Sequence, residues 1–589
     1  MSDQRLQLMI YGDNIAAYRP TTVESQWLIE SIERTENPNY LFINLVINKD
    51  AKAGDYQLLF VKKTQSLKQD SSTISIKYTL KKRRSGSALR QGFSSADSIY
   101  LVTPDRFANG KTSNDQVNGM LEGVNRNNQD DRHGGDIQGI INHLEYIADM
   151  GFSQLWVTPM LENNNPQYSY HGYGITDHYQ IDKRFGSNRS YKELSKTARQ
   201  KGIGLIKDSV LNHVSTNHWW MKDLPSLDWF NHGKTFVATS HKRESLHDIH
   251  ATEEDRKAFT DGWFVPTMAD LNQRNPLVER YLIQNNIWWI EMADLSGIRI
   301  DTFSYSEKYF LQNYTQQIMQ EYPNFNLVAE EWSISPIIVS YWQRGKQRHD
   351  QYNFELPSLM DFPLQNALIE ALNQKESWAD GLQKLYSNIA TDFIYPDAGN
   401  LVVFPDNHDM SRIFTQLKND IKLTKMAIAF IATTRGIPQF YYGTEILMEN
   451  PSSDSHGEIR SDFPGGWQDD KVSAFTGIGL SEEQKDMQYF VKNLLNWRKN
   501  SEATKKGKLT HYAPKQGVYV YFRHSDKQKV MIVLNKNFES IDIDPLNYPS
   551  MLSESERQGK ATNIITNKPV VLDRKFKVEG RSAYVLQIN

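Results

Sequence analysis

The sequence contains no cysteine, and this absence excludes disulfide bonds, thiolate zinc sites and cysteine nucleophiles together. No apolar run reaches the length that a transmembrane helix needs. Basic residues do not outnumber acidic ones, and the net charge of −3 gives no basic footprint for nucleic acid. The first residues, MSDQRLQLMIYG, lack the basic and apolar segments of a signal peptide. We therefore expect no nucleic-acid partner and no membrane span.

Aromatic residues, by contrast, are plentiful. They make up 12% of the chain, with 13 Trp and 29 Tyr. Many of them are expected in the core, but an excess of rings also suits a site that stacks against flat apolar faces of a ligand. At 589 residues the chain is too long for one ordinary domain.

Both ends of the chain have the pattern of β-modules. Short strands are expected near the N-terminus at 6–12, 40–47, 54–63 and 72–83. They indicate an immunoglobulin-like β-sandwich over residues 1–90, followed by a polar linker. After a helix near 481–499, strand patterns return and predict a C-terminal β-sandwich over residues 506–589.

Between these modules, in residues 97–505, strands alternate with helices. The expected strands are 98–104, 152–159, 202–210, 297–303, 326–332, 352–359, 400–406 and 436–443. A helix is expected over 136–151, where apolar residues keep the i, i+3, i+4 spacing of one stripe. Eight such units predict an α/β fold, the (β/α)8 TIM barrel, whose chemistry lies at the C-terminal strand ends. Residues 214–270 are too many for a plain loop and predict a subdomain inserted after the third strand.

One expected strand carries a charge pair. In GIRIDTF, Ile298 and Ile300 alternate with Arg299 and Asp301, so the two ionisable side chains share one face. Such a pair is commonly a structural salt bridge. The alternative is a carboxylate that a neighbouring guanidinium keeps ionised and ready to attack an electrophile.

Position along the barrel favours the functional interpretation. Other ionisable or polar residues stand at the ends of other expected strands: Asp208, Asn212, His213, Glu330, His408 and Asp409. At the same end of successive barrel strands they would converge on one pocket, and burying so much charge without a task is costly. Facing carboxylates are what glycosyl transfer needs, one as nucleophile and one as acid and base, while a third stabilises the transition state.

These residues lie in segments that resemble the shared regions of the α-amylase family, glycoside hydrolase family 13. The segments are YHGYGITDHYQIDKRFG (170–186), DSVLNH (208–213), MADLN (268–272), GIRIDT (297–302), VAEEW (328–332) and FPDNHD (404–409). The resemblance implies Asp301 as nucleophile, Glu330 as general acid and base, and Asp409 as transition-state stabiliser. Glu330 is preferred to Glu331 because the acid of the family follows a small residue, and strand alternation sends Glu331 to the opposite face.

The resemblance also implies residues that bind the substrate. Arg299 would hold Asp301 ionised, His213 and His408 would bind sugar hydroxyls, and Tyr173 would stack beneath the sugar with His171 nearby. For Tyr173 alone, simple core packing is the plainer interpretation.

An N-terminal β-module before the barrel, with TPDRFANG (103–110) and FPGGW (463–467), resembles the cyclomaltodextrinase and neopullulanase branch of the family. That branch implies a retaining hydrolase of α-1,4-glucosidic bonds in maltooligosaccharides, cyclodextrins, pullulan and starch; Thr302 after the nucleophile agrees with α-1,4 linkages, whereas Ala269 departs from the usual Pro. The alternatives are an ordinary endo-α-amylase, an α-glucanotransferase, or a non-catalytic α-glucan-binding relative.

The segment DRFANGKTSND resembles a calcium loop of this branch. The resemblance implies the ligands Asn109, Asn114, Asp115, the carbonyl of Gly134, and Asp136, and hard oxygen donors suit Ca²⁺. Lys111 stands where the family commonly has Asp, so its side chain must point away or the site must be weak. A second family site near Asn212 and Asp270 has Tyr305 in place of a His. The alternative for the first loop is an ordinary polar turn.

The resemblance bears on two further properties. Together with the abrupt MSD start, it favours a periplasmic mature chain, with a cytoplasmic maltodextrin enzyme as the alternative. Relatives of this branch often dimerise through the N-terminal domain, so a homo-oligomer is an expected partner besides the α-glucan substrates.

Overall fold

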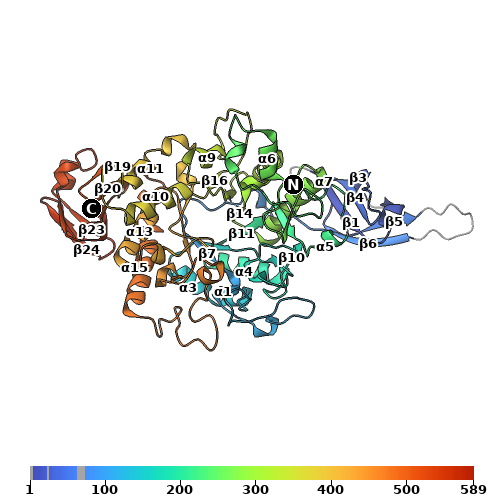
Figure 1. Cartoon of the computed structure of the whole chain (residues 1–589), viewed down its shortest axis with the longest axis horizontal. Helices are drawn as coiled ribbons and strands as arrows, with labels where there is room; N and C mark the ends of the chain where they lie inside the picture. Colours follow the sequence, from blue (N-terminus) through green and yellow to red (C-terminus); the bar gives the residue numbers. More distant parts are fainter. Residues whose placement is uncertain (1–3, 23–24, 63–72, 589) are drawn as a thin grey trace, which may run out of the picture.

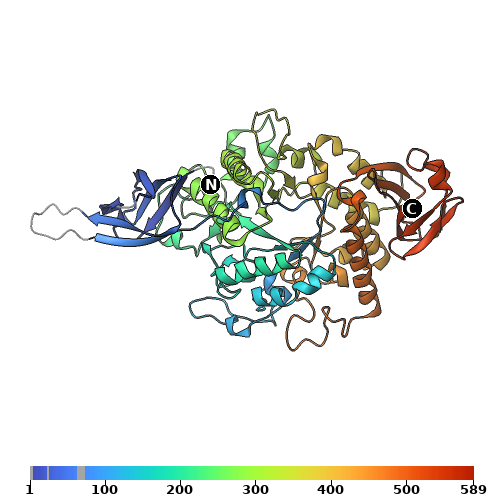
Figure 2. The ribbon, with the colours of Figure 1, turned by 180° about the vertical axis from the view of Figure 1, so that it is seen from behind.

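The protein is described here from a computed structural model, which covers residues 4–22, 25–62 and 73–588. Residues 63 and 72, each at the end of an expected strand, lie outside the described residues. The molecule is elongated, with the N-terminal strands at one end, the C-terminal strands at the other and the barrel between them (Figures 1 and 2). Within the described ranges, the helices are all too short or too polar to cross a membrane.

Six strands form the N-terminal region: β1 (Arg5–Tyr11), β2 (Tyr18–Thr21), β3 (Trp27–Glu33), β4 (Tyr40–Ile47), β5 (Gly54–Lys62) and β6 (Thr73–Leu80). They make two antiparallel sheets, ordered β1-β4-β3 and β2-β5-β6. Trp27, Leu41 and Phe60 belong to the small core of this region. The sequence pattern did not predict β2, a short strand that contains Pro20, or β3, whose register shifts between Ile29 and Ser31 and breaks the alternation.

The barrel contains the eight predicted strands, all parallel. They are β7 (Ile99–Val102), β8 (Gln154–Val157), β11 (Gly204–Val210), β14 (Gly297–Asp301), β15 (Asn326–Ala329), β16 (Ser358–Leu359), β17 (Val402–Val403) and β18 (Ile437–Tyr441). Their order, β16-β15-β14-β11-β8-β7-β18-β17, follows the chain around the ring. A single bridge between Met360 and Val402 joins the two ends of this order. The TIM barrel prediction is therefore confirmed.

Helices cover the outside of the barrel, so its strands are buried on both faces. The longer ones are α4 (Asn188–Gln200), α7 (Pro276–Ala293), α8 (Lys308–Glu321), α10 (Phe362–Asn373), α13 (Ile421–Thr433) and α15 (Glu482–Arg498). The helix expected over 136–151 is split into α2 (Ile137–Asn142) and α3 (Leu144–Asp149) at His143, whose ring stacks on Phe475. Shorter elements fill the loops: α1 (Pro104–Phe107), α9 (Pro336–Tyr341), α11 (Gln383–Ile389), α12 (Ile413–Gln416), α14 (His456–Ile459), α16 (Glu502–Lys505), β9 (Leu161–Glu162) and β10 (Asp177–Ile181).

The segment after β11 forms the expected protrusion. At its base β12 (His213–Ser215) pairs antiparallel with β13 (Met268–Asp270). Between them lie α5 (Trp219–Lys222) and α6 (Glu253–Thr260). Trp220, Trp229 and Trp263 are buried there and pack in the same hydrophobic core as the barrel, so their rings hold the insertion against it.

The N-terminal region is fastened to the barrel by polar contacts. Gln7 and Gln284 of α7 exchange two hydrogen bonds of 2.9 Å between side chain and backbone. After β6, Arg83 lies 2.5 Å from Glu321 of α8. These contacts hold the N-terminal region against α7 and α8.

The C-terminal region is also built from strands. A six-stranded sheet has the order β19-β20-β21-β26-β23-β24, and β22 pairs with β25. Their bounds are β19 (Lys508–Lys515), β20 (Val518–His524), β21 (Lys529–Asn535), β22 (Ile541–Ile543), β23 (Lys560–Asn563), β24 (Lys568–Val571), β25 (Phe576–Val578) and β26 (Ser582–Ile588), with the short helix α17 (Glu554–Arg557). Phe522, Met531 and Leu586 lie in the core of this region.

Candidate active site

Strand β14 places the charge pair inside the barrel. Ile298 and Ile300 alternate with Arg299 and Asp301, and all four are buried. In the parallel register, Asp208 of β11 lies beside Arg299. Asp208, Arg299 and Asp301 thus lie toward the C-terminal ends of two adjacent strands, where TIM barrels carry their chemistry.

The guanidinium of Arg299 contacts three carboxylates. Its Nη1 lies 2.8 Å from Asp301 Oδ1 and 3.0 Å from Asp208 Oδ1. Its Nη2 lies 2.8 Å from Glu330 Oε1. The guanidinium of Arg299 therefore contacts both Asp301 and Glu330, the residues that the family resemblance implies as nucleophile and acid.

Thr302 links the same two carboxylates. Its backbone N–H donates to Glu330 Oε2 at 3.0 Å, and its hydroxyl donates to Asp301 Oδ2 at 3.2 Å. The φ of Thr302 is +41°, in the left-handed region that a β-branched residue rarely adopts. Strained backbone of this kind persists where the surrounding structure enforces it, commonly at functional sites.

Asp409 lies on the other side of the site. His408 Nε2 is 3.0 Å from Asp409 Oδ2, and Arg460 Nη2 is 2.6 Å from Asp409 Oδ1. Arg460, directly after α14, also donates from Nε to the carbonyl of His408 at 2.8 Å. The carboxylate of Asp409 is therefore held in place by two side chains.

Tyr173 connects the two halves of the site from below. Its hydroxyl donates to Asp208 Oδ2 at 3.1 Å and lies 2.5 Å from His408 Nε2. Its backbone N–H donates to His171 Nδ1 at 2.8 Å, and the two rings are 5.8 Å apart. Tyr173 is 9% exposed, so one part of its ring is packed and another faces the cavity.

These side chains meet in one cavity of about 360 Å³. It is lined by His171, Tyr173, His213, Arg243, Phe264, Met268, Asp301, Thr302, Ser304, Tyr305, Glu330, Trp332, Asp409, His456 and Arg460. Arg299 and His408 do not line it and lie buried beneath it. His213 Nε2 is buried and lacks a hydrogen-bond partner among the described residues, so it is a polar atom that a ligand hydroxyl could satisfy.

Burial and mutual repulsion raise the pKa of both central carboxyls. For Asp301, burial and the charges of Glu330, Asp208 and Asp409 outweigh Arg299, and the pKa lies well above its usual value. For Glu330, burial is again the largest cause of a raised pKa, and Arg299 lowers it. Because one guanidinium faces three carboxylates, we infer that the Asp301 and Glu330 pair shares one proton.

Burial favours the neutral form of the histidines of the site. Burial lowers the pKa of His213 to about 4 and that of His171 to about 3. Burial also lowers the pKa of His408 well below its usual value. Asp409 differs, because His408 and Arg460 lower its pKa against the effect of burial. The site thus combines a firmly ionised carboxylate with a pair that retains a proton.

Glu331 lies outside this cluster, as alternation predicted. Its carboxylate is 3.5 Å from Arg243 of the insertion. Arg243 also donates to the carbonyl of Trp332. Burial raises the pKa of Glu331 to about 7, although Arg243 lowers it.

Several lining residues were missed from the sequence. Arg460 follows a short helix in a long loop, and Arg243 and Phe264 belong to the insertion. Trp332 is two residues after Glu330 and stacks on Phe362 at 4.7 Å. Only Trp332 carried a signal, since an exposed aromatic next to the expected acid suits a sugar site.

The residues expected to bind calcium come together from two segments, 109–115 and 134–136. Asn109 donates to Asp115 at 2.9 Å and Asn114 donates to Asp136 at 3.1 Å. A Cβ on Gly134 would meet Asn109 and Asp115 at 2.9 Å, so the backbone of Gly134 packs directly against them.

The chain belongs to the α-amylase family. Residues 101–507 match the family model of the α-amylase catalytic domain. Residues 1–84 match the N-terminal domain of cyclomaltodextrinase, and residues 509–587 match the cyclo-malto-dextrinase C-terminal domain. The barrel is therefore that of a glycoside hydrolase, and its flanking domains are those of the cyclomaltodextrinase branch.

Individual relatives agree with this assignment. A cyclomaltodextrinase of Thermoanaerobacter pseudethanolicus is 27% identical over 450 residues, which is 74% of this chain and 70% of that protein. A β/α-amylase of Paenibacillus polymyxa is 27% identical over 76% of this chain, and the match spans 34% of its own length. The crystal structure of an α-amylase from Geobacillus thermoleovorans, complexed with acarbose, superposes with a TM-score of 0.68 at 26% identity, covering 85% of this chain and 99% of that one.

Proposed function

We propose that the protein hydrolyses α-1,4-glucosidic bonds of maltooligosaccharides, cyclodextrins, pullulan and starch with retention of configuration. The observation that carries the proposal is the position of Asp301 and Glu330 on one guanidinium, each 2.8 Å from a nitrogen of Arg299. Retaining glycosidases keep their two carboxyl groups closer together than inverting ones, which leave room for a water. The names of relatives support the substrate class.

In the first step, an oxygen of Asp301 attacks the anomeric carbon, and the bond from that carbon to the leaving oxygen breaks. Glu330 gives the leaving oxygen its shared proton, so an alcohol departs and an ester to Asp301 is left. In the second step, Glu330 takes a proton from water, whose oxygen attacks the same carbon and releases Asp301. Both carboxyls return to their starting state.

The remaining residues position and stabilise. Asp409, ionised between His408 and Arg460, faces the positive charge that develops on the sugar ring. His213 offers the unpartnered Nε2 to a hydroxyl. Tyr173 provides a ring on which an apolar sugar face can stack.

Calcium fits the loop around Asn109. Asn114 Oδ1 is a buried oxygen without a hydrogen-bond partner among the described residues. The carboxyls of Asp115 and Asp136 have pKa values raised mainly by burial, and an added cation would offset that cost. The Lys111 side chain is exposed and so leaves room for a cation. The ion would be held by Asn109, Asn114, Asp115, the Gly134 carbonyl and Asp136, and would supply structural support.

Two further expectations stay predictions. The N-terminal region projects from the barrel (Figure 1), which leaves its sheets free to pair with a second copy; light scattering on the purified chain measures this. The periplasmic location rests on family analogy and is tested by fractionating the cells that make the protein.

Product analysis tests the proposed function. The wild type and Asp301→Asn would be incubated with γ-cyclodextrin, pullulan and soluble starch, and the released sugars identified over time. We expect ring opening of the cyclodextrin, panose from pullulan, and a loss of at least about 10³ in rate for D301N, as when a covalent nucleophile is removed. Fast cleavage of starch with resistant cyclodextrin and pullulan would indicate an ordinary α-amylase. A fully active D301N would show that Asp301 is not the nucleophile and only forms a structural salt bridge with Arg299.

A further inference from the structure

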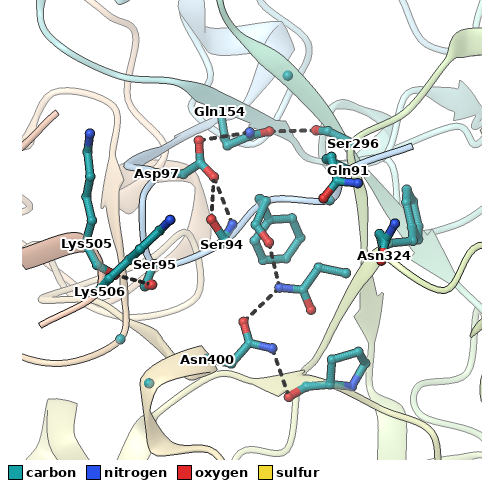
Figure 3. Close-up of a pocket in the computed structure, with 18 of the residues that line it drawn as sticks. Gln91, Ser94, Ser95, Asp97, Gln154, Ser296, Asn324, Asn400, Lys505 and Lys506 are labelled. Carbon is teal, nitrogen blue, oxygen red and sulfur yellow. Dashed lines mark hydrogen bonds between the residues drawn. The ribbon is translucent and has the colours of Figure 1, made fainter. Parts of the chain in front are cut away.

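A second, larger cavity lies at the opposite end of the barrel. It has a volume of about 840 Å³ and is lined by residues at which barrel strands begin, among them Gln154 of β8, Gly204 of β11 and Asn326 of β15. Asp301, in contrast, is at the end of β14. The linker (91–97) and the segment 505–507 complete the walls (Figure 3). This cavity is therefore separate from the active site and shares no lining residue with it.

The charges that line this cavity are mostly positive. The cations are Arg199, Arg344, Arg435, Lys505, Lys506 and Arg523. The only lining carboxylates among the described residues are Asp97 and Asp397. An excess of cations around a concave site favours a negatively charged occupant.

Two of these cations already have carboxylate partners. Arg199 is 3.2 Å from Asp294, and Arg435 is 2.6 Å from Asp361. Lys505, Lys506 and Arg344 have no ion pair in the described parts of the chain. Three cations at the rim are thus available to a ligand.

Arg523 is a buried cation without a carboxylate partner among the described residues. Its side chain is buried, with the residue 3% exposed. Its Nη1 and Nη2 donate only to backbone carbonyls, those of Thr434, Thr504 and Gly507, at 2.6 to 3.0 Å. Its Nε lacks a partner among the described residues. Carbonyl oxygens satisfy hydrogen bonds but leave the charge of the guanidinium without a counter-charge.

A second buried guanidinium stands behind the wall. Arg498 donates to the carbonyls of Ala432, Ser95 and Asp97, and has no carboxylate partner in the described residues. Burial, together with the charge of Arg523, lowers the pKa of Arg498 to about 9. The two guanidiniums therefore add to one positive region, which lacks a direct ion pair to either of them among the described residues.

The carboxylate of Asp97 offsets part of this positive charge, since its own charge raises the pKa of Arg498. It accepts hydrogen bonds from the N–H of Ser94 at 2.8 Å, from the Ser153 hydroxyl at 2.7 Å and from Gln154 at 3.2 Å. In Figure 3 Asp97 is turned toward Gln154 and Ser94, and Lys505 and Lys506 lie on the side marked by Ser95.

We propose that this cavity binds a small phosphate-bearing ligand, with the phosphate held by Lys505, Lys506 and Arg523. Arginine and lysine are the side chains that recognise phosphate oxygens, and the other lining groups are mainly polar. The aromatic rings among the described lining residues are those of Phe93 and Phe325. Amides of Gln91 and Asn324 line the same space and suit the hydroxyls of a phosphorylated sugar.

The location gives the ligand a structural effect. Arg523 belongs to β20 of the C-terminal region, Lys505 ends α16 and Lys506 follows it, and α16 joins the barrel to that region. A phosphate bound between them would hold the C-terminal sheet and the barrel together. Since a ligand that binds only the folded state stabilises it, the unfolding midpoint should rise with ligand concentration.

Isothermal titration of the full-length protein in a phosphate-free buffer tests this proposal. The probes are inorganic phosphate, glucose 6-phosphate and, as the neutral control, glucose. We expect saturable binding of both phosphates, a rise of the unfolding midpoint with each, and no comparable effect of glucose. Tighter binding of glucose 6-phosphate would identify a sugar phosphate as the natural class, and equal binding would identify free phosphate.

Variants assign the binding to this cavity. The double substitution K505Q/K506Q should weaken phosphate binding by about tenfold or more, because charge-assisted hydrogen bonds are lost. The double substitution K81Q/K82Q, which also removes two adjacent exposed lysines but on the N-terminal region, should bind like the wild type. Arg523 is tested with Arg523→Lys, which keeps the positive charge, because a neutral side chain at this buried position could prevent folding.

Three results would overturn the proposal: no saturable binding of either phosphate at millimolar concentrations, equal weakening in both double variants, or glucose binding as tightly as glucose 6-phosphate. The proposal does not depend on hydrolysis, because all of its readouts are binding and stability.

Discussion

The guanidinium of Arg243 lies 3.5 Å from the carboxylate of Glu331, the residue that directly follows Glu330. Arg243 belongs to the inserted subdomain and also contacts the carbonyl of Trp332. The insertion therefore contacts the segment that carries Glu330, the proposed general acid, while Arg299 contacts Glu330 itself. This gives Arg243 a positioning role.

We expect Arg243→Gln to lower kcat by roughly tenfold, since a small displacement of a catalytic group is costly. Arg243→Lys should recover part of the loss, because the charge beside Glu331 returns. Steady-state kinetics on a maltooligosaccharide measure both, with Lys257→Gln on the exposed side of the same subdomain as the control. Equal kcat in R243Q and K257Q would show that the contact positions nothing.

The buried Glu331 should make stability depend on pH. Its pKa is raised from 4.5 to about 7, mainly by burial, so between these values the folded state holds a proton that the unfolded state has lost. Stability from this group is therefore full below pH 4.5 and falls as pH rises toward 7, by about 3 kcal/mol at most.

Glu331→Gln removes this titration. Unfolding midpoints of the wild type and E331Q are measured from pH 4.5 to 8. As pH rises, the midpoint of the wild type should fall relative to that of E331Q. A difference between them that stays constant across this range contradicts the assignment.

The pH dependence of catalysis should follow the Asp301 and Glu330 pair. Activity needs one proton on the pair, and both pKa values are raised by burial and neighbouring charge. Activity should therefore be lost as pH rises through the upper pKa of the pair, above the ordinary Glu value of 4.5. Asp208→Asn removes a charge that raises both pKa values. The alkaline limb of the pH profile, where activity is lost, should therefore move to lower pH.

For D208N, the quantity to measure is the pH at which kcat/KM falls on the alkaline side, and not the absolute rate. Asp149→Asn, which removes an exposed carboxylate on α3, serves as the control and should leave the limb in place. An unchanged limb in D208N would mean that the pair does not set the pH dependence.

Removal of calcium should destabilise the loop around Asn109. We expect the unfolding midpoint to fall on chelation and to recover on adding Ca²⁺, as for an ion bound only by the folded state. Asp115→Asn should abolish most of this response, because a charged ligand is lost. Asp131→Asn, in a neighbouring loop, should respond like the wild type, and an equal response in D115N would place the ion elsewhere.

The sequence predicted the barrel because short strand patterns, bounded by turn residues, alternate with helical patterns along residues 97–505. The strand GIRID, for example, was expected at 297–303 and is observed at Gly297–Asp301. The strands expected at 352–359 and 400–406 are reduced to two residues each, Ser358–Leu359 and Val402–Val403. Pairing with neighbours, which no local pattern contains, sets these lengths.

The site was predictable only where it follows strand ends. Asp301 and Glu330 occupy such positions, and the resemblance to a family supplied their roles. Arg460 and Arg243 come from a loop and from the insertion, so their approach to Asp409 and Glu331 depends on tertiary packing. Nothing in local periodicity places a loop residue in a pocket.

The bridge between Met360 and Val402 makes the barrel a ring with one weak link. Backbone amides along β16 and β17 should therefore exchange with deuterium sooner than those of β14, whose neighbours pair over four or five residues on each side. Asp409 follows β17, whereas Arg299 and Asp301 are on β14. Asp301, the proposed nucleophile, thus lies on a strand that is paired on both sides, whereas Asp409, the proposed stabiliser, follows a strand at the weak link. A barrel that opens under stress would displace Asp409 before Asp301.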